Sequence, residues 1–382
     1  MYLHIKFVLL SIMLVISTIV FSYFVVQRYH SKIPIINQMF TESAKKANSD
    51  AEEISPYDGL KPENNNPNGI YYKDRVLVLM YHDLSPEPKD AGTLSVVNFE
   101  KQLELMRDNN FHWITMSEYT DFILHSAPVP DNAVLLTFDD GYESFYTYAY
   151  PLLKKYQAPA SNFLIVNAID NPEYKGIPKV TWEQVELMHR NGIEFFSHTY
   201  DSHKYAKTDS SSTEETAMLA GRIYLKDQQR QETEEEYKQR ITKDLKQAND
   251  ILQQKLGIQN HVLAFPFGGF SKTLLDLCGE LGMDVTLTVK MGLNKPGQTN
   301  GFRLNTGGMA NDPALQLSLM KHAEKKLGSI QFDEGPRTRH YYTLKALLVL
   351  VVVAALWLWS GWRLLEERKR AMSLYGVKVW LE

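Results

Sequence analysis

The chain has 382 residues, enough for one domain of about 250 residues with extensions on either side. Its 23% charged and 44% hydrophobic residues are ordinary for a globular protein, and the formal net charge of −4 argues against a nucleic-acid-binding protein. A single cysteine, Cys278, excludes an internal disulfide framework and a four-cysteine zinc site. Because leucines surround Cys278 at helical spacing, we expect it to pack in the core.

The first predicted element is an apolar helix. Residues 7–26 form a run of 20 residues without a charge, between Lys6 and Arg28. The run is long enough to span a bilayer, and no small-residue cleavage site follows it. We therefore interpret residues 1–28 as an uncleaved signal anchor that crosses the membrane. The next segment is rich in Asn and Pro, so we expect residues 29–71 to be a flexible extracytoplasmic stalk.

From residue 72 onward, short apolar runs alternate with helical patterns. The predicted strands span residues 76–81, 133–138, 161–166, 193–197, 262–265, 285–289 and 302–305. The predicted helices span residues 99–109, 146–156, 182–191 and 272–281. This alternation predicts a parallel sheet, most simply in a barrel-like α/β domain that covers residues 72–325. In such barrels, catalytic groups lie at the carboxyl ends of the strands.

One long polar segment interrupts the alternation. Residues 210–257 carry many charges but keep an apolar stripe that includes Tyr237, Ile241 and Leu245. We predict a helical insertion over this segment. Its charges are interpreted as a solvated helix face rather than a binding tract.

A second apolar run lies near the C-terminus. Residues 346–362 are uncharged, and their tryptophans gather toward the C-terminal side, as is typical of a membrane interface. We predict a linker over residues 326–343, a transmembrane helix over 344–362 and a basic cytoplasmic tail over 363–382. A buried helix of a soluble domain is the alternative for the apolar run. Two spans would place both termini in the cytoplasm and the domain on the extracytoplasmic face of the cell membrane.

Adjacent carboxylates follow the predicted strand 133–138, in the sequence Thr-Phe-Asp-Asp-Gly-Tyr. Burying Asp139 and Asp140 side by side costs several kcal/mol unless something compensates their charge. A bound cation would compensate it, with one carboxylate as a ligand and the other as a base. A surface Asp-Asp-Gly turn is the alternative for this motif taken alone.

Two histidines follow the predicted strand 193–197. His198 and His203 are five residues apart, which is wrong for one helix face but suits a loop that curls across a strand end. Two imidazoles and one carboxylate are a common set of ligands for a divalent metal. Ordinary polar loop residues are the alternative for this pair taken alone.

Two further strand ends carry possible site residues. His82 and Asp83 follow the first predicted strand, where a lone histidine is usually structural. The sequence Pro-Phe-Gly-Gly after strand 262–265 is either a tight turn or a set of exposed backbone N–H groups that includes that of Phe267.

Together these motifs resemble those of the NodB-homology polysaccharide deacetylases, carbohydrate esterase family 4. The resemblance rests on Thr-Phe-Asp-Asp-Gly, on Ser-His-Thr with its second histidine, and on Pro-Phe-Gly, in this order. It covers roughly residues 72–325. It implies a deformed (β/α) barrel, here flanked by two transmembrane helices. It also implies hydrolysis of the N-acetyl groups of polymers that contain N-acetylglucosamine.

Three departures from the family pattern refine this resemblance. The two histidines are five residues apart instead of four, and no Leu-x-His motif follows late in the domain. Ala264 stands two residues before the Pro of the Pro-Phe-Gly motif, where the family usually has an Arg. Arg303 would have to take the role of that missing arginine. With Tyr81-His82-Asp83 and the insertion, these features are similar to a circularly permuted branch. That branch includes the poly-β-1,6-N-acetyl-D-glucosamine N-deacetylases of biofilm matrix.

The resemblance implies a role for each matching residue. Asp140, His198 and His203 would bind the metal, and Asp139 would be the general base toward the attacking water. His82 would protonate the departing amine, because an amide anion is too basic to leave. The backbone N–H of Phe267 is expected to donate to the oxyanion, and the ring of Tyr142 to stack on a sugar. Arg303 is expected to be an electrostatic partner. Asp83 would either orient His82 or be a turn residue.

The sequence therefore predicts a membrane-anchored, metal-dependent polysaccharide N-deacetylase. The favoured substrate is poly-β-1,6-N-acetylglucosamine of a biofilm matrix, and peptidoglycan or another amino-sugar polymer is the alternative. A catalytically silent scaffold of an exopolysaccharide synthase or export complex is the competing class. The favoured cofactor is Zn²⁺, although two histidines and one aspartate also suit Co²⁺, Ni²⁺ or Fe²⁺.

Overall fold

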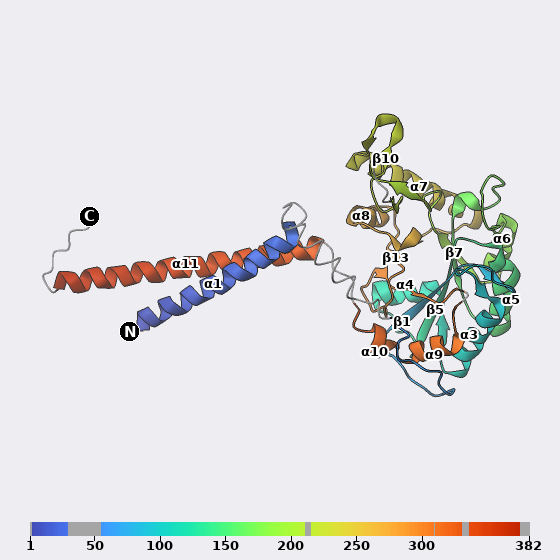
Figure 1. The fold of residues 1–382 in the computed structure, drawn as a ribbon, viewed down its shortest axis with the longest axis horizontal. Coiled ribbons are helices and arrows are strands. Elements are labelled where there is room, and N and C mark those ends of the chain that lie inside the picture. The colour runs from blue at the N-terminus through green and yellow to red at the C-terminus, as the bar shows by residue number, and fades with distance from the viewer. Residues whose placement is uncertain (1, 30–54, 211–214, 309, 331–335, 375–382) are drawn as a thin grey trace. The chain divides into compact units, whose positions relative to one another are not determined.

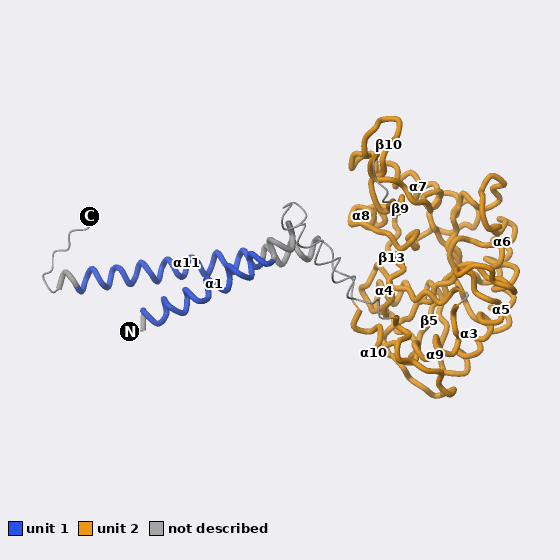
Figure 2. The backbone as a smooth tube through the Cα atoms, in the orientation of Figure 1, with its two compact units in different colours: residues 1–54, 331–382 blue, residues 55–330 orange. Residues whose placement is uncertain are grey.

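The computed structural model describes residues 2–29, 55–210, 215–308, 310–330 and 336–374. The chain forms two compact units, residues 1–54 with 331–382, and residues 55–330 (Figure 2). Parts of three predicted segments lie outside the described residues, namely 30–54 of the stalk, 331–335 of the linker and 375–382 of the tail. The two units are described separately below.

The first unit is a pair of long helices, α1 (Tyr2–Tyr29) and α11 (Pro336–Leu374), which run side by side in opposite directions (Figure 1). Each contains a stretch long and apolar enough to cross a membrane, His4–Tyr23 and Lys345–Ala371. The two helices are joined by a ring stack between Phe7 and Trp357, with centroids 5.3 Å apart. Trp357 also donates a hydrogen bond of 2.9 Å from Nε1 to Oγ of Ser11.

The second unit is built on a nine-stranded sheet in the order β14-β13-β12-β7-β6-β5-β1-β15, with β4 also beside β5. Every pairing in this sheet is parallel, which confirms the predicted parallel α/β fold. Its strands are β1 (Val76–Tyr81), β4 (His112–Ile114), β5 (Ala133–Asp139), β6 (Ser161–Leu164), β7 (Glu194–Ser197), β12 (Val262–Ala264), β13 (Val285–Leu287), β14 (Asn300–Gly301) and β15 (Leu304–Asn305).

Helices follow most of these strands (Figure 1). They are α3 (Val96–Asp108), α4 (Met116–His125), α5 (Tyr150–Tyr156), α6 (Trp182–Arg190), α7 (Glu234–Leu256), α8 (Lys272–Glu280), α9 (Pro313–Lys321) and α10 (Ala323–Leu327). A π-helical turn, Phe145–Ala149, precedes α5. Capping boxes begin α4, α6 and α7, where a Thr at the N-cap and a Glu or Gln three residues later satisfy each other's backbone N–H groups.

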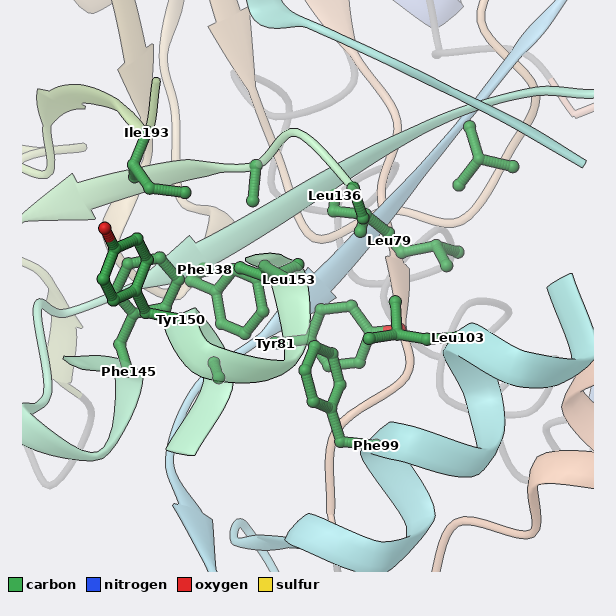
Figure 3. Close-up of a cluster of buried hydrophobic side chains, with 14 of the residues drawn as sticks. Leu79, Tyr81, Phe99, Leu103, Leu136, Phe138, Phe145, Tyr150, Leu153 and Ile193 are labelled. Atoms are coloured by element: carbon green, nitrogen blue, oxygen red, sulfur yellow. The ribbon is translucent and has the colours of Figure 1, made fainter. Parts of the chain in front are cut away.

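The central strands are buried on both faces, because alternate side chains enter different apolar clusters. Leu136 and Phe138 of β5 belong to one cluster, whereas Leu135 belongs to another. Figure 3 shows Phe138 packed with Tyr81 of β1 and Phe99 of α3, and the Tyr81 and Phe138 rings are 5.0 Å apart. Charged side chains are costly inside strands buried in this way and are favoured at their ends. The charged residues after β1, β5 and β7 therefore gather at one edge of the sheet.

The predicted stalk is wrong for residues 55–71, which belong to the second unit. The backbone N–H of Asn66 donates to Oδ1 of Asn109 over 2.7 Å, and the rings of Tyr71 and Phe111 stack at 5.2 Å. Lys321 also donates from Nζ to a backbone carbonyl of this segment over 2.7 Å. A segment rich in Asn and Pro looks flexible by composition, but the domain supplies partners for its backbone. The domain thus spans residues 55–330 rather than 72–325.

Among the described residues of the predicted helical insertion 210–257, only the second half is α-helical, as α7, and a 3-10 turn lies at Lys226–Gln228. Before it lie β8 (Tyr205–Lys207) paired antiparallel with β9 (Glu215–Ala217), and β10 (Tyr224–Leu225) paired antiparallel with β11 (Arg230–Gln231). These strands have two or three residues each, too few to show an alternating pattern. For the same reason, the sequence pattern did not predict β4 or the paired strands β2 (Leu84–Ser85) and β3 (Leu94–Ser95).

The last predicted strand, 302–305, is also corrected. Asn300 and Gly301 pair with β13, whereas Leu304 and Asn305 pair with β1. Phe302 and Arg303 lie between these two short strands, which are at opposite ends of the strand order. Arg303, at this break, has a fully buried side chain.

Candidate active site

The site lies at the carboxyl ends of parallel strands. Asp139 ends β5 and Asp140 follows it, His82 comes directly after β1, and His198 directly after β7. The register places Asp139 opposite Phe163 of β6, next to β7. The structure thus brings together three segments that are far apart in the sequence, because neighbouring parallel strands all end at the same edge.

Asp140, His198 and His203 form a group whose ligand atoms all lie within 4.8 Å of one another. Oδ1 of Asp140 is 3.5 Å from Nε2 of His198 and 3.2 Å from Nε2 of His203. A tetrahedral zinc ion with ligand bonds of about 2.0–2.1 Å separates its ligand atoms by roughly 3.3 Å. Oδ1 of Asp140 is also buried without a hydrogen-bond partner among the described residues. The donor set, its spacing and this unpaired oxygen all fit a divalent cation.

His198 is held with Nε2 directed toward the group. Its Nδ1 lies 2.8 Å from the backbone carbonyl of Ala264, so Nδ1 carries the proton and Nε2 has a free lone pair. Burial lowers the pKa of His198 to about 4, although the charges of Asp139 and Asp140 oppose this shift. The imidazole is therefore neutral at physiological pH, as a metal ligand must be.

The loop between the two histidines is held by a residue of α7. Asp244 accepts the backbone N–H of Tyr200 at Oδ1 over 3.1 Å and that of Asp201 at Oδ2 over 2.9 Å. Burial raises the pKa of Asp244, and its hydrogen bonds with this loop oppose the rise. Asp244 could not be recognised from the sequence, where it resembles the other charges of a solvated helix face.

Backbone strain accompanies this site. Asp140 and Thr199 have φ of 72° and 78°, and Phe267 has φ of 56°, each in the left-handed region that non-glycine residues rarely adopt. Thr199 is stabilised there because Ser202 donates its backbone N–H to the Thr199 hydroxyl over 3.2 Å. Strained residues of this kind cluster at functional sites, where the surrounding structure holds them in place.

Asp139 is bound on its buried side by Arg303. Nη1 and Nη2 of Arg303 donate to Oδ1 and Oδ2 of Asp139 over 2.7 and 2.8 Å. Burial alone would raise the pKa of Asp139, but the charges of Arg303 and His198 and the hydrogen bonds from Arg303 hold it well below its usual range. Asp139 is therefore an ionised acceptor at any working pH. Arg303, named from the sequence as a replacement for the arginine missing at Ala264, does contact this carboxylate.

His82 lies on the solvent side of the same carboxylate. Its Nε2 is 4.0 Å from Oδ2 of Asp139, and about a third of its side chain is exposed. Asp83, the neighbouring residue, accepts from the hydroxyl of Ser144 over 2.6 Å and from that of Thr93 over 3.1 Å. These contacts hold the turn after β1 in place, and they favour the turn role for Asp83 over direct orientation of His82.

Tyr142 is largely buried beside the metal ligands. Burial, together with the charge of the nearby Asp140, raises the pKa of Tyr142. The ammonium group of Lys179 lies 3.6 Å from the centre of the Tyr142 ring, and burial lowers the pKa of Lys179 to about 8. Tyr142 thus lies between Lys179, which covers one face of its ring, and the nearby carboxylate of Asp140. This arrangement leaves little of it for the sugar stacking expected from the sequence.

A cavity of about 250 Å³ adjoins His82 and Tyr142. It is lined further by Asp83, Asp90, Ala91, Gly92, Thr93, Ile177, Asn305, Gly307 and Gly308. Because His82 opens into this cavity, it marks where part of a substrate would lie.

Phe267 closes the opposite side of the site. Its ring lies 4.5 Å from that of His203 and 4.0 Å from that of Tyr205, which the sequence analysis did not name. Gly268 follows with φ of 68°, and a Cβ there would be 2.9 Å from the backbone nitrogen of Val289. Only glycine allows this close approach of the turn to Val289.

Comparisons with known proteins agree with this geometry. Residues 126–286 match the family model described as polysaccharide deacetylase. A poly-beta-1,6-N-acetyl-D-glucosamine N-deacetylase of Escherichia coli (strain K12) is 28% identical over 253 residues, which are 63% of this chain and 37% of that protein. The chain thus matches little more than a third of the length of this relative.

Two further similarities point the same way. A poly-beta-1,6-N-acetyl-D-glucosamine N-deacetylase of Staphylococcus aureus (strain MSSA476) is 24% identical over 250 residues, which are 60% of this chain and 79% of that protein. The solved structure of a de-N-acetylase from Aggregatibacter actinomycetemcomitans is similar with a TM-score of 0.56 and 25% identity. That similarity covers 63% of this chain and 96% of the other. The chain therefore contains a domain of the polysaccharide deacetylase family.

Proposed function

We propose that this protein is a metal-dependent N-deacetylase of an N-acetylglucosamine polymer. The observation that carries the proposal is the buried, unpaired Oδ1 of Asp140, which lies within 3.5 Å of Nε2 of both His198 and His203. The names of the E. coli and S. aureus relatives favour poly-β-1,6-N-acetylglucosamine as the polymer. Peptidoglycan or another amino-sugar polymer is the alternative substrate.

A divalent cation held by Asp140, His198 and His203 would polarise the acetamide carbonyl and lower the pKa of the attacking water. Zn²⁺ is favoured by the ligand set, and Co²⁺, Ni²⁺ and Fe²⁺ also accept two imidazoles and a carboxylate. The tautomer of His198, set by the carbonyl of Ala264, presents Nε2 to the cation without rearrangement. Tyr142 lies close enough to Asp140 for the two groups to interact electrostatically.

Asp139 is the proposed general base. Both of its oxygens accept from Arg303, so the carboxylate plane has one orientation and its remaining lone pairs face the site. It would accept a proton from the water that attacks the acetamide carbon. The ion pair with Arg303 also reduces the repulsion between Asp139 and Asp140. The backbone N–H of Phe267 is the proposed second donor to the oxyanion.

His82 is the proposed general acid. Its Nε2 is 4.0 Å from Oδ2 of Asp139, on the side that opens into the cavity. It would donate a proton to the departing nitrogen, so that the sugar leaves as an amine and acetate is released. A base and an acid on two sides of one bond are what hydrolysis of an unactivated amide needs.

We further infer that α1 and α11 anchor the enzyme in the cell membrane. Both contain apolar stretches long enough to span it, and their antiparallel packing suits a hairpin with both termini in the cytoplasm. The catalytic unit would then meet the polymer on the extracytoplasmic face, beside a synthase or export complex. Its product would carry free amines and positive charge, which changes adhesion of the matrix to anionic surfaces.

Acetate release tests the proposal. The full-length chain in detergent micelles is incubated with β-1,6 and β-1,4 N-acetylglucosamine hexamers, after dialysis against chelator and after addition of Zn²⁺, Co²⁺ or Ni²⁺. We expect acetate release only with metal, and faster from the β-1,6 hexamer. His125→Ala, at an exposed position in the last turn of α4, serves as the matched control. Release from neither hexamer under any metal would contradict the proposal and favour a catalytically silent scaffold.

A further inference from the structure

An exposed aromatic pair lies beside the metal-binding group. The rings of Tyr205 and Phe267 are stacked, with centroids 4.0 Å apart and planes at 25°. Tyr205 is 53% exposed and Phe267 is 38% exposed, so both remain open to solvent. Two adjoining exposed aromatic side chains are unusual on a surface, and such patches commonly bind a ligand.

The fold holds both rings in place. Tyr205 belongs to β8 and lies opposite Ala217 of β9 in the antiparallel register. Ala217 packs on the turn that carries Phe267, because a Cβ added to Gly269 would lie only 2.9 Å from the Ala217 Cβ. Hence the hairpin β8–β9 and the Pro-Phe-Gly turn are in direct contact. The pair is a preformed surface, which loses little conformational freedom when a ligand binds.

This surface is continuous with the site. The Phe267 ring is 4.5 Å from the ring of His203, and His203 is one of the three proposed metal ligands. From the metal-binding group to Tyr205 there are thus two ring-to-ring contacts. When an N-acetyl group of a polymer lies at the metal, the next sugar of that polymer would lie near Tyr205.

We propose that Tyr205 and Phe267 form a sugar-binding subsite, in which a pyranose ring next to the reacting residue stacks on Tyr205. The inference rests on the proposed function and extends it to how a polymer is distinguished from a short substrate. A pyranose has an apolar face of C–H groups, which loses water favourably against an aromatic ring. The nearby ammonium of Lys204 is already paired with Asp201 over 2.7 Å, so the subsite suits a neutral sugar.

A different role for the pair makes a different prediction. If Tyr205 and Phe267 only support the imidazole of His203, removing Tyr205 would weaken metal binding and slow every substrate equally. A subsite, in contrast, contributes only when the substrate is long enough to reach it. Chain-length dependence therefore separates the two roles.

The test compares the full-length parent chain with Tyr205→Ala and Tyr205→Phe on N-acetylglucosamine dimers, tetramers and hexamers. For Tyr205→Ala we expect kcat/KM to fall about 3- to 10-fold on the hexamer, mainly through KM, with a smaller loss on the dimer. Tyr205→Phe keeps the ring and should restore parent behaviour. Tyr224→Ala, in the neighbouring β10–β11 hairpin, is the matched control and should match the parent. Equal losses at all lengths, or weaker Zn²⁺ binding in Tyr205→Ala, would overturn the subsite.

A binding measurement keeps the subsite testable if no acetate is released. The hexamer is titrated calorimetrically into the chelator-treated parent chain and into chelator-treated Tyr205→Ala. Weaker binding to the variant by a similar factor supports the subsite even where the proposed hydrolysis fails. Equal binding to both chains contradicts the subsite and leaves the proposed hydrolysis to be judged on acetate release alone.

Discussion

Arg303 binds Asp139 through two hydrogen bonds, Nη1 to Oδ1 over 2.7 Å and Nη2 to Oδ2 over 2.8 Å. Both side chains are buried, with at most 2% of either exposed to solvent. The guanidinium fork matches the two carboxylate oxygens, which a lysine could not do. The pair places a fixed positive charge behind the proposed base. It therefore links the stability of the domain to the chemistry of the site.

Replacing Arg303 is expected to affect folding. Arg303→Met removes one partner of a buried ion pair and leaves the Asp139 carboxylate uncompensated, which costs about 3–5 kcal/mol of unfolding free energy. Urea unfolding followed by circular dichroism measures the change. The exposed pair Arg230–Glu236 offers a control, because Arg230→Met should hardly move the midpoint. A small loss for Arg303→Met would show that the domain relaxes to hydrate Asp139.

The same variant is expected to shift the pH dependence of activity. Arg303 lowers the pKa of Asp139, so its removal raises that pKa and moves the acid limb of the kcat/KM profile to higher pH. The stabilisation from a lowered pKa is present above the unfolded value of about 3.9 and is lost as pH falls below it. The stability difference between parent and variant should therefore shrink in acid. An unmoved acid limb in Arg303→Met would argue against Asp139 as the base.

Removing a proposed ligand is expected to abolish tight metal binding. Asp140→Ala takes away the oxygen that lies between His198 and His203, and Zn²⁺ affinity should fall by more than about a hundredfold, beyond what supporting residues usually contribute. Competition with a zinc-sensitive dye measures the affinity. His125→Ala is the control, since His125 is exposed on α4. Parent-like Zn²⁺ binding by Asp140→Ala would place the cation elsewhere.

Asp244 is expected to control metal affinity without touching the metal. Asp244→Ala leaves the backbone N–H groups of Tyr200 and Asp201 without their acceptors, so the loop that carries His203 loses its position. We expect Zn²⁺ affinity to fall about 10- to 100-fold. Asp244→Asn, which keeps one acceptor oxygen, should lie between the variant and the parent. Asp250→Asn, on the same helix and paired with Lys246, is the control. A fall in thermal stability with unchanged Zn²⁺ affinity would reduce Asp244 to a purely structural role.

The membrane orientation can be tested with cysteine labelling. Cys278 is buried, and burial raises its pKa to about 12, so the native thiol should not react with a maleimide. With an impermeant maleimide on intact cells, Ser126→Cys in the domain should label, and Lys369→Cys in the basic segment after the uncharged run 346–362 should not. Labelling of both after the membrane is opened is the control. Labelling of Lys369→Cys on intact cells would contradict a cytoplasmic C-terminus.

Much of the site could be predicted from the sequence alone. The runs 76–81 and 133–138 are apolar because their strands are buried on both faces, so polar residues directly after them had to lie at strand ends. Parallel strands end at one edge, so His82, the Asp139-Asp140 pair and His198 were expected to meet there. The family resemblance followed from the same motifs, and the match over residues 126–286 confirms it.

What the sequence could not decide depends on contacts between distant segments. Arg303 is 164 positions from Asp139 and lies between two strands of two residues each, which have no recognisable period. Asp244 looked like a solvated charge until α7 was packed behind the histidine loop. Tyr205 lies in a three-residue strand whose partner, β9, decides where its ring stands. Local pattern thus determined the buried strands and the residues that end them, because burial leaves a mark in each short stretch of sequence. Only the tertiary structure decided which distant side chains support that site, because their positions depend on how the sheet curves and which loops pack together.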